Sequence, residues 1–429
     1  MTKPPIDRRL TLLATALLFA LFASYGILKP LRDNVGQYFG RDILPRVWLG
    51  TAIVTVVVSA LLSAAIARFP RRKVAPWAFA ISAVVTALTW FGYQSVALGS
   101  GSGGAEAPHA FWVPALFYWW VSTYLMVGLA LFWGLMADLY GSAAGKRSFG
   151  PIAVGGTLGQ LGGAAFTEQF AQPLGLLPLL SLAVALLVLA AVVCVVLLGV
   201  ATRADEPTHA RSSGVGGSWW EGFAACVKDP YLGAILGYVA LQTFAAAVLS
   251  LEVVDAVRAH FGKDQAARTS FNARLDFWSQ AITLGLQFAL VGPLMARFGA
   301  GIALAIQPLA YAIGFTALAF ATPAAFLVTI ACFEVARRSS NYGFAKPSRD
   351  ALFTVCTPAD KYKAKSAIDA AAFRIFDYVF AEASNAWRRL MAGLIGSGIA
   401  ASAAVAVPVA LGWAGLALGL GRMHRRRGG

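Results

Sequence analysis

The chain has 429 residues, of which 58% are hydrophobic and only 13% are charged, and its formal net charge is +15. A soluble globular domain carries about a quarter charged residues, so this composition excludes an ordinary soluble protein. Membrane proteins keep Lys and Arg on the cytoplasmic side of each span, which explains the positive charge without a nucleic-acid partner.

Long apolar runs follow one another along the chain. About 20 residues of helix cross the ~30 Å hydrocarbon core of a bilayer, and residues 181–200 form such a run without a charge. A short basic head precedes the first run, but no small-residue cleavage site follows, so we interpret this run as a span rather than a signal peptide. The sequence predicts twelve spans, at about residues 10–30, 47–67, 75–97, 111–139, 150–170, 174–200, 230–254, 274–296, 300–320, 324–342, 366–387 and 391–420.

One long polar connection divides these spans into two sets of six. Residues 201–225 are rich in Gly and Ser, which is typical of a flexible linker. We therefore expect a six-helix bundle over residues 1–200, a cytoplasmic linker over 201–228 and a second six-helix bundle over 229–429. The expected fold class is an all-α membrane protein with two pseudo-symmetric bundles, similar to the major facilitator fold.

The basic residues also determine the expected topology. With the N-terminus inside, most of the Lys and Arg residues fall in cytoplasmic segments, whereas the opposite orientation places most of them outside. We expect both termini to be cytoplasmic and the chain to cross the lipid bilayer of a bacterial-type inner (plasma) membrane many times.

Other chemistries have little support. The four cysteines lie outside any extracellular loop, and no Cys/His cluster has the spacing of a metal site, so neither disulfides nor a metal is expected. Residues 141–147 differ from a phosphate-binding loop because the spacing is one residue short and no Ser or Thr follows the Lys. We expect no cofactor and no enzymatic activity, so transport must be driven by a gradient or by exchange.

Charged residues within the spans are the candidate binding residues. Lys29, Arg32 and Asp33 lie in the outer part of the first span, where charge costs free energy unless it is paired or faces water. The alternative is that the two cations snorkel to the interface. Glu252, at the outer end of the seventh span, is their expected counterion, because the first and seventh spans are equivalent in a duplicated chain.

The eleventh span carries a second candidate set. Arg374 lies about 12 Å into a helix that starts near residue 366, and Asp377 lies deeper, near the midplane. The structural alternative is an ion pair along one helix face. Intramembrane ions are functional candidates by default, so we interpret both as cavity residues. In the tenth span, Arg337 and Arg338 are expected to be interfacial anchors.

Two basic clusters open the fifth and eleventh spans. Lys146 and Arg147 precede the fifth span, and Lys361, Lys363 and Lys365 precede the eleventh. The clusters lie half a chain apart, which indicates the internal duplication common in secondary transporters. We expect these cations to gate the cytoplasmic side by pairing with acids or helix C-termini of the opposite bundle.

Glycines repeat every four residues in the fifth span, at Gly155, Gly159 and Gly163. Small residues at this spacing let two helix backbones approach closely. The repeat therefore predicts tight packing against a neighbouring helix.

Together these motifs resemble the ATP:ADP antiporter (nucleotide translocase) family and its bacterial relatives, within the major facilitator superfamily. The resemblance implies two six-helix bundles around a central cavity with alternating access. It also implies that Arg32, before Asp33, helps to bind phosphates, and that Glu252, in a Leu-Glu-Val context, matches a glutamate of the family. Two positions depart from the family: residues 111–137 hold no acid, and Asp377 stands where a Lys is usual. The matching stretches are residues 25–36, 68–73, 131–163, 267–278, 339–355 and 360–377.

The expected function is exchange or uptake of a phosphorylated anionic metabolite, such as a nucleotide, by a secondary transporter. Arg32 and Arg374 are expected to bind the phosphate with Lys29 assisting, because the planar guanidinium matches phosphate oxygens two at a time. One alternative is a proton-coupled transporter of a different small solute, with Asp33, Asp377 or Glu252 carrying the proton. The other alternative is a membrane scaffold or sensor that does not transport.

Overall fold

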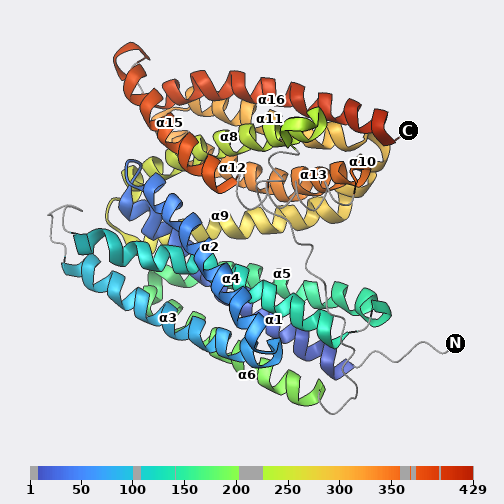
Figure 1. Ribbon diagram of the computed structural model, residues 1–429. Coiled ribbons are helices and arrows are strands. Elements are labelled where there is room, and N and C mark those ends of the chain that lie inside the picture. Colours follow the sequence, from blue (N-terminus) through green and yellow to red (C-terminus); the bar gives the residue numbers. More distant parts are fainter. Residues whose placement is uncertain are drawn as a thin grey trace. The chain divides into compact units, whose positions relative to one another are not determined.

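The computed structural model describes residues 8–99, 108–140, 142–201, 226–357, 368, 373–395 and 398–428, and every regular element in this part of the chain is a helix (Figure 1). The expectation of an all-α membrane fold is therefore confirmed. Each of the first ten expected spans corresponds to one helix or to one continuous run of helices, whereas the expected boundary between the last two, at residues 388–390, lies inside the helix Phe373–Ile395.

The described residues divide into two compact units. The first comprises those within Met1–Phe39, Gly50–Ser213 and Asp264–Phe277, and the second those within Gly40–Leu49, Gly214–Lys263 and Trp278–Gly429. Two short segments thus differ from the expected boundaries, since residues 264–277 join the first unit and residues 40–49 join the second. Side-chain contacts described below explain both exchanges.

The helices of the first unit are α1 (Arg8–Phe39), α2 (Leu44–Arg68), α3 (Arg71–Gly99), α4 (Pro108–Leu139), α5 (Ser142–Leu174) and α6 (Leu176–Ala201), together with the start of α9 (Gln265–Leu286). Here α1 packs along α5 and α6, and α3 packs against α4 and α6. Gly175 alone separates α5 from α6, and its positive φ of 76° is one that glycine adopts without steric cost.

The predicted close packing of the glycine repeat is confirmed by the α1–α5 interface. A Cβ atom at Gly155 would lie 2.6 Å from the carbonyl oxygen of Thr15, and Cβ atoms at Gly159 and Gly163 would also overlap the backbone of α1. On the α1 side, a Cβ atom at Gly26 would lie 2.6 Å from the carbonyl oxygen of Gln160. Glycine is therefore needed on both helices for their backbones to touch.

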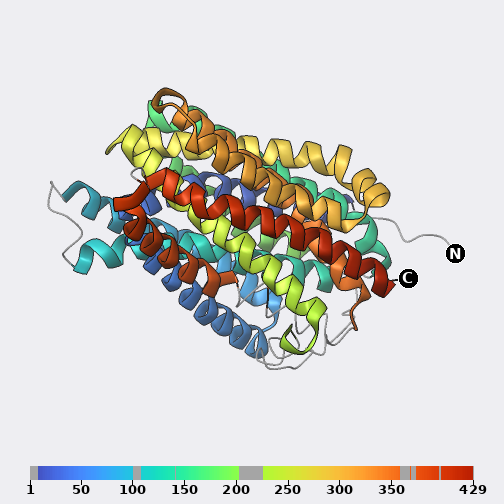
Figure 2. The ribbon, with the colours of Figure 1, turned by 90° about the horizontal axis from the view of Figure 1, so that it is seen from above.

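The second unit contains α8 (Pro230–Phe261), the rest of α9, α10 (Gly292–Phe298), α11 (Ala300–Ala319), α12 (Pro323–Ser340), α13 (Lys346–Leu352), α15 (Phe373–Ile395) and α16 (Gly398–Gly428). A π-helical turn, η1 (Gln287–Val291), joins α9 to α10, and a second one, η2 (Asn341–Ala345), joins α12 to α13. A short 3-10 turn, η3 (Phe353–Val355), follows α13. The long helix α16 lies along α8 and α11 in both views (Figures 1 and 2).

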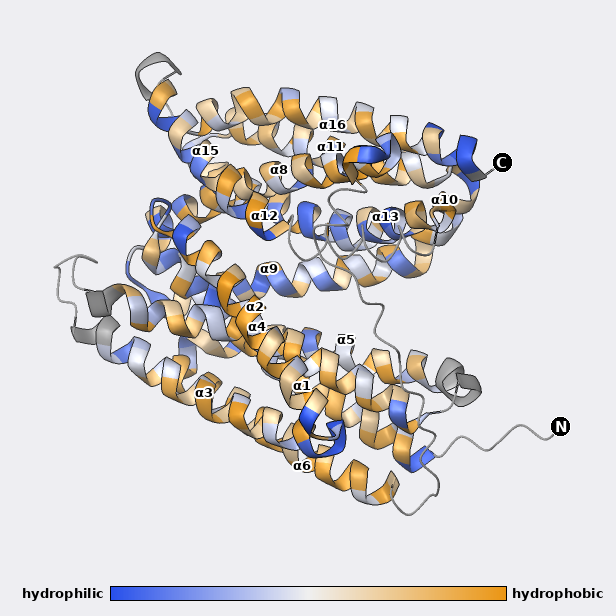
Figure 3. Ribbon diagram, viewed as in Figure 1, coloured by the Kyte–Doolittle hydropathy of each residue, from blue (hydrophilic) through white to orange (hydrophobic). Residues whose placement is uncertain are grey.

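Among the described residues, nine helices are long and apolar enough to cross a membrane. Large apolar side chains cover exposed faces of these helices, for example Val56 and Leu61 on α2 and Val195 on α6, as lipid-facing side chains do. Figure 3 shows α3 and α6 mainly in orange, whereas the C-terminal end of α16 is blue.

The expected fifth, tenth and eleventh spans, α5, α12 and α15, do not reach that apolarity within the described residues. The polar sequence of these helices is the reason: α5 is rich in glycine, α12 carries Glu334 with Arg337 and Arg338, and α15 carries Arg374 and Asp377. Inside a membrane protein, helices of this kind face protein or water rather than lipid.

Candidate functional site

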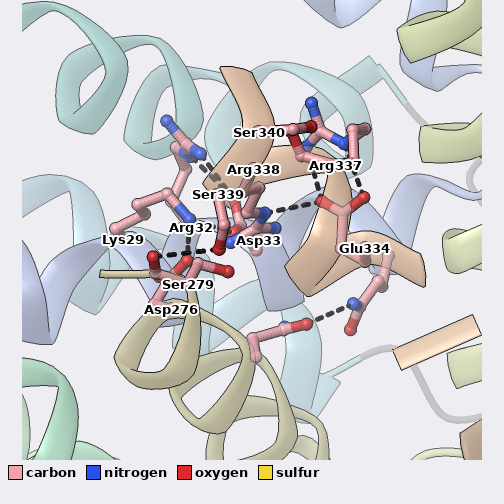
Figure 4. A network of polar contacts seen from close by, with 12 residues as sticks. Lys29, Arg32, Asp33, Asp276, Ser279, Glu334, Arg337, Arg338, Ser339 and Ser340 are labelled. Atoms are coloured by element: carbon pink, nitrogen blue, oxygen red, sulfur yellow. Dashed lines mark hydrogen bonds and ion pairs between the residues drawn. The ribbon is translucent and has the colours of Figure 1, made fainter. Parts of the chain in front are cut away.

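An ionic cluster joins α1 to the start of α9 in the first unit. Lys29 donates hydrogen bonds to Asp33, at 3.1 Å, and to Asp276. Arg32 donates to Asp33 through Nε at 3.0 Å and through Nη2 at 2.6 Å, and its guanidinium lies 5.5 Å from the centre of the Tyr118 ring. Figure 4 shows Lys29 reaching Asp276 and Asp33 beside Arg32.

Protein atoms cover most of this cluster. The side chains of Lys29 and Arg32 are each 16% exposed, and that of Asp276 is 5% exposed. Such coverage fits cations that are paired inside the protein better than cations that snorkel to an interface. The cluster holds two cations and two anions, so its formal charge is balanced.

Asp276 was missed at the level of sequence. It lies near the start of the expected eighth span, where an acid is easily taken as interfacial. The available signal was an acid inside an apolar span, which is the same signal that singled out Asp377.

A second network surrounds Glu252 on α8. Its carboxylate accepts hydrogen bonds from Arg41 at 2.8 Å and from Ser402 at 2.7 Å, and Arg388 lies 3.4 Å away. Arg41 also donates to Asp255 at 2.7 Å. The carboxylate of Glu252 is 3% exposed, so these partners replace nearly all of its hydration.

These partners differ from the expected pairing of Glu252 with Lys29 or Arg32. The backbone supplies the reason, because α1 ends at Phe39, Gly40 follows with a positive φ of 73°, and the chain turns so that Arg41 meets α8. A side chain at Gly40 would also overlap the guanidinium of Arg258. This contact explains why residues 40–49 belong to the second unit.

A third cluster lies at the end of α12. Arg337 donates to Glu334 through Nε at 2.7 Å and Nη2 at 2.6 Å, and Arg338 donates to the same carboxylate at 2.6 Å (Figure 4). Glu334 is 3% exposed, whereas the two arginines are 18% and 17% exposed. The expected interfacial anchors are therefore directed to a buried carboxylate, since Glu334 lies three residues before Arg337 and four before Arg338, about one helical turn away.

Two further arginines of the second unit, Arg349 on α13 and Arg374 on α15, also have neighbours that the structure describes. Arg349 on α13 is 7% exposed, donates to Gln242 at 3.1 Å and lies 5.1 Å from the centre of the Phe373 ring. On α15, Asp377 lies within electrostatic reach of Arg374 and Arg337. The structure thus links Asp377 to the arginines of both α12 and α15.

The expected cytoplasmic gate falls outside what can be described. The side chains of Lys146 and Arg147, and all of Lys361, Lys363 and Lys365, lie outside the described residues, so their gating role stays a prediction. The described residues also contain no group of three or more His, Cys, Asp or Glu placed to hold a metal ion.

No protein-family model matches the chain, and no curated protein sequence matches it. Many solved structures do resemble it. The nucleoside transporter NupG has a TM-score of 0.57 and 16% identity over 97% of this chain and 98% of its own.

Two further transporters show the same likeness. The inward-open xylose transporter XylE from E. coli has a TM-score of 0.55 and 17% identity, over 94% of this chain and 95% of its own. An inward-facing bacterial homologue of the iron transporter ferroportin has a TM-score of 0.64 and 14% identity, over 96% and 98%. The chain therefore has the helical fold of major-facilitator-type membrane transporters.

Proposed function

We propose that this chain is a secondary transporter that works by alternating access and exchanges or takes up a phosphorylated anionic metabolite, such as a nucleotide. The fold supports transport, because the solved structures that share it are transporters, one of them of nucleosides. Fold alone does not define a substrate, so the choice of an anion depends on the charges of the described residues.

An excess of basic residues on the polar helices of the second unit carries the proposal. Low dielectric strengthens the attraction of such residues for an anion, and arginine offers phosphate two parallel hydrogen bonds. Between Glu334 and Asp377 the described residues hold five bases, Arg337, Arg338, Lys346, Arg349 and Arg374, and three acids, Glu334, Asp350 and Asp377.

In the first unit, we assign phosphate binding to Arg32 with assistance from Lys29. Arg32 directs Nε and Nη2 to a single carboxylate oxygen of Asp33, and the same edge of the guanidinium can instead donate to two oxygens of a phosphate. In this proposal Asp33 holds the cation when no substrate is bound, and the phosphate competes with it. Arg374 on α15 is the other residue to which we assign phosphate binding.

Proton-coupled transport of another solute is the second candidate. Its support is the burial of carboxylates on membrane helices, above all Glu252, which is 3% exposed and surrounded by hydrogen-bond donors. Protonation of such a group releases its cationic partners and can be coupled to a conformational change. The two candidates differ in whether a pH gradient or internal counter-substrate drives uptake.

The test is uptake of labelled ATP, ADP, ribose 5-phosphate and inorganic phosphate into proteoliposomes, with and without internal counter-substrate and with an imposed pH gradient. We expect uptake of a phosphate compound to depend on internal counter-substrate. Uptake of none of these compounds, with a pH gradient driving other solutes, would favour the proton-coupled candidate.

Variants connect the uptake to the proposed residues. Arg32→Ala and Arg374→Ala should each reduce binding of the transported compound by roughly 10-fold or more, because each removes a charge-assisted contact. Arg389→Ala is the matched control, since Arg389 is 71% exposed and pairs only with the exposed Asp42 among the contacts described for it. Equal effects of all three variants contradict the assignment.

A further inference from the structure

Three buried amide side chains lie on α1 and at the start of α9 in the first unit. Asn34, Gln37 and Asn272 are 0%, 2% and 3% exposed. Gln37 donates to Asn272 at 2.9 Å, and this bond joins the two helices. Asn34 lies three residues before Gln37, and residues three apart share one face of a helix.

Four hydrogen-bonding atoms of this amide cluster have no partner among the described residues. They are both amide atoms of Asn34, the remaining oxygen of Gln37 and the remaining nitrogen of Asn272. Turning the amide of Asn34 by 180° still leaves one donor and one acceptor, and turning the amides of Gln37 and Asn272 together does the same. The cluster therefore offers two donors and two acceptors whichever way the amides are assigned.

Burying such groups without partners is costly. Each unsatisfied buried polar atom destabilises a fold by about 1–3 kcal/mol. These four amide atoms therefore lower the stability of the fold unless a ligand forms hydrogen bonds with them. Apolar side chains of the same shape would fill the space between α1 and α9 without that cost. Lys29 and Asp276, only a few residues away on the same two helices, do form an ion pair.

The amide cluster adjoins the ionic cluster along both helices. On α1, Gln37 follows Asp33 by four residues and shares its helix face. On α9, Asn272 precedes Asp276 by four residues and shares its helix face. A ligand whose charged end meets Lys29 thus has its next part within reach of Gln37 and Asn272.

We propose that Asn34, Gln37 and Asn272 form a subsite for a neutral group of the substrate that carries hydrogen-bond donors and acceptors side by side. The edge of a nucleobase has this pattern, and so do the hydroxyls of a sugar. A phosphate does not fit, because at neutral pH it is mainly an acceptor and would leave the amide oxygens unmet. The subsite extends the proposed function from the charge of the substrate to its neutral part.

The experiment measures binding by titration calorimetry to the full-length purified protein. The probes are AMP, ribose 5-phosphate, inorganic phosphate, adenosine and xylose. Asn34→Leu keeps the shape of the side chain and removes both hydrogen-bonding atoms. Gln307→Leu is the control, because Gln307 on α11 is a 1% exposed amide of the second unit that also has an oxygen without a partner.

If a nucleobase occupies the subsite, Asn34→Leu should weaken AMP by roughly 10- to 100-fold and leave ribose 5-phosphate and phosphate unchanged. If sugar hydroxyls occupy it, ribose 5-phosphate weakens as well, while phosphate does not. Asn34→Ser, which retains one donor and one acceptor, should restore part of the lost affinity. Gln307→Leu should change none of these values.

Thermal unfolding separates this role from a purely structural one. For a binding subsite, Asn34→Leu raises the Tm of the unliganded protein, because it removes unsatisfied polar atoms. A lower Tm, or a higher Tm with every affinity unchanged, overturns the subsite. If no phosphate compound binds even the parent protein, the proposed function fails, and adenosine and xylose then test the subsite alone. Loss of adenosine or xylose binding in Asn34→Leu supports the subsite. Unaltered or undetectable binding of both compounds overturns it.

Discussion

The guanidinium of Arg41 donates a hydrogen bond to the carboxylate of Glu252 at 2.8 Å, although the two residues lie 211 positions apart in the chain. Arg41 is 9% exposed and Glu252 is 3% exposed, so the pair is almost completely removed from solvent. Hydrogen bonds from Arg41 to Asp255 and Asn385 complete its shell. The connection between α1 and α2 is therefore fixed within the second unit by a buried network of charges.

Removal of Arg41 should destabilise this unit strongly. Arg41→Ala leaves the buried carboxylate of Glu252 without its principal cation, which costs about 3–5 kcal/mol in comparable cases. Arg46→Ala, two residues inside α2 and on an exposed position, should change stability by less than about 0.5 kcal/mol. Denaturant unfolding of the purified variants measures both effects, and similar values for the two variants would contradict the network.

The glycines of α5 predict opposite changes in stability when alanine replaces glycine at two positions of this helix. Gly155→Ala places a Cβ atom 2.6 Å from the carbonyl oxygen of Thr15, so α1 and α5 must separate, at a cost of about 1–3 kcal/mol. Gly162→Ala meets no atom within 4 Å and should stabilise the helix by up to about 1 kcal/mol. Thermal unfolding of both variants checks the signs. Two shifts in the same direction would show that helix propensity, not packing, decides the outcome.

Hydropathy located the helices well, because a membrane-spanning helix is recognised from the length and the apolarity of a continuous stretch of sequence. The expected span at 174–200 is the helix Leu176–Ala201, and the span at 300–320 is Ala300–Ala319. The glycine repeat of α5 likewise predicted that a neighbouring helix packs closely against α5, although it did not identify that helix. Features of this kind are local in sequence, so the sequence alone contains them.

The sequence alone could not show which charged residues pair with one another. Whether Glu252 meets Arg41 or Lys29 depends on the left-handed turn at Gly40 and on the rotation of α8 about its axis, neither of which changes hydropathy. Asp276 was overlooked for a related reason, since its partner Lys29 lies 247 positions away. Long-range pairs of this type become visible only when the helices are placed.

The start of α8 predicts a dependence of stability on pH. Asp229 caps this helix by accepting a hydrogen bond from the backbone of Tyr231, and Arg427 donates to both of its carboxylate oxygens. These bonds, those from Arg427 first, hold the pKa of Asp229 below its usual value of about 4. Because the folded state binds the proton less readily, the contribution to stability is present above pH ~4 and is lost as the pH falls through the lowered pKa.

Arg427→Gln should therefore lower the Tm at pH 7, and the difference from the parent should shrink as the pH approaches 3. Arg426→Gln is the matched control at the adjacent exposed position of the same helix end. Thermal unfolding across this pH range measures the effect, which is expected to be small because both partners are partly exposed. A difference that stays constant with pH would assign the effect to something other than the charge of Asp229.

Variants of the ion pair between Lys29 and Asp276 can separate its contribution to stability from its contribution to transport. Asp276→Asn alone leaves Lys29 with Asp33 as its remaining described acid and should destabilise the first unit, because a covered cation loses a full countercharge. Replacing both partners, with Lys29→Met and Asp276→Leu, removes the two charges together and should recover most of that stability. A double-mutant cycle on unfolding, built from Lys29→Met, Asp276→Leu and the double variant, should thus give a coupling above about 1 kcal/mol, whereas the exposed pair Arg71 and Asp138 should give about 0–1 kcal/mol.

Transport should not recover with stability in the double variant. If Lys29 assists in binding phosphate, the stable Lys29→Met/Asp276→Leu protein still lacks that cation and should take up labelled substrate poorly into proteoliposomes. Asp276→Asn retains the cation, so its residual uptake per folded molecule should exceed that of the double variant. Full uptake by the double variant would restrict this pair to a structural role and leave Arg32 as the sole phosphate contact proposed for the first unit.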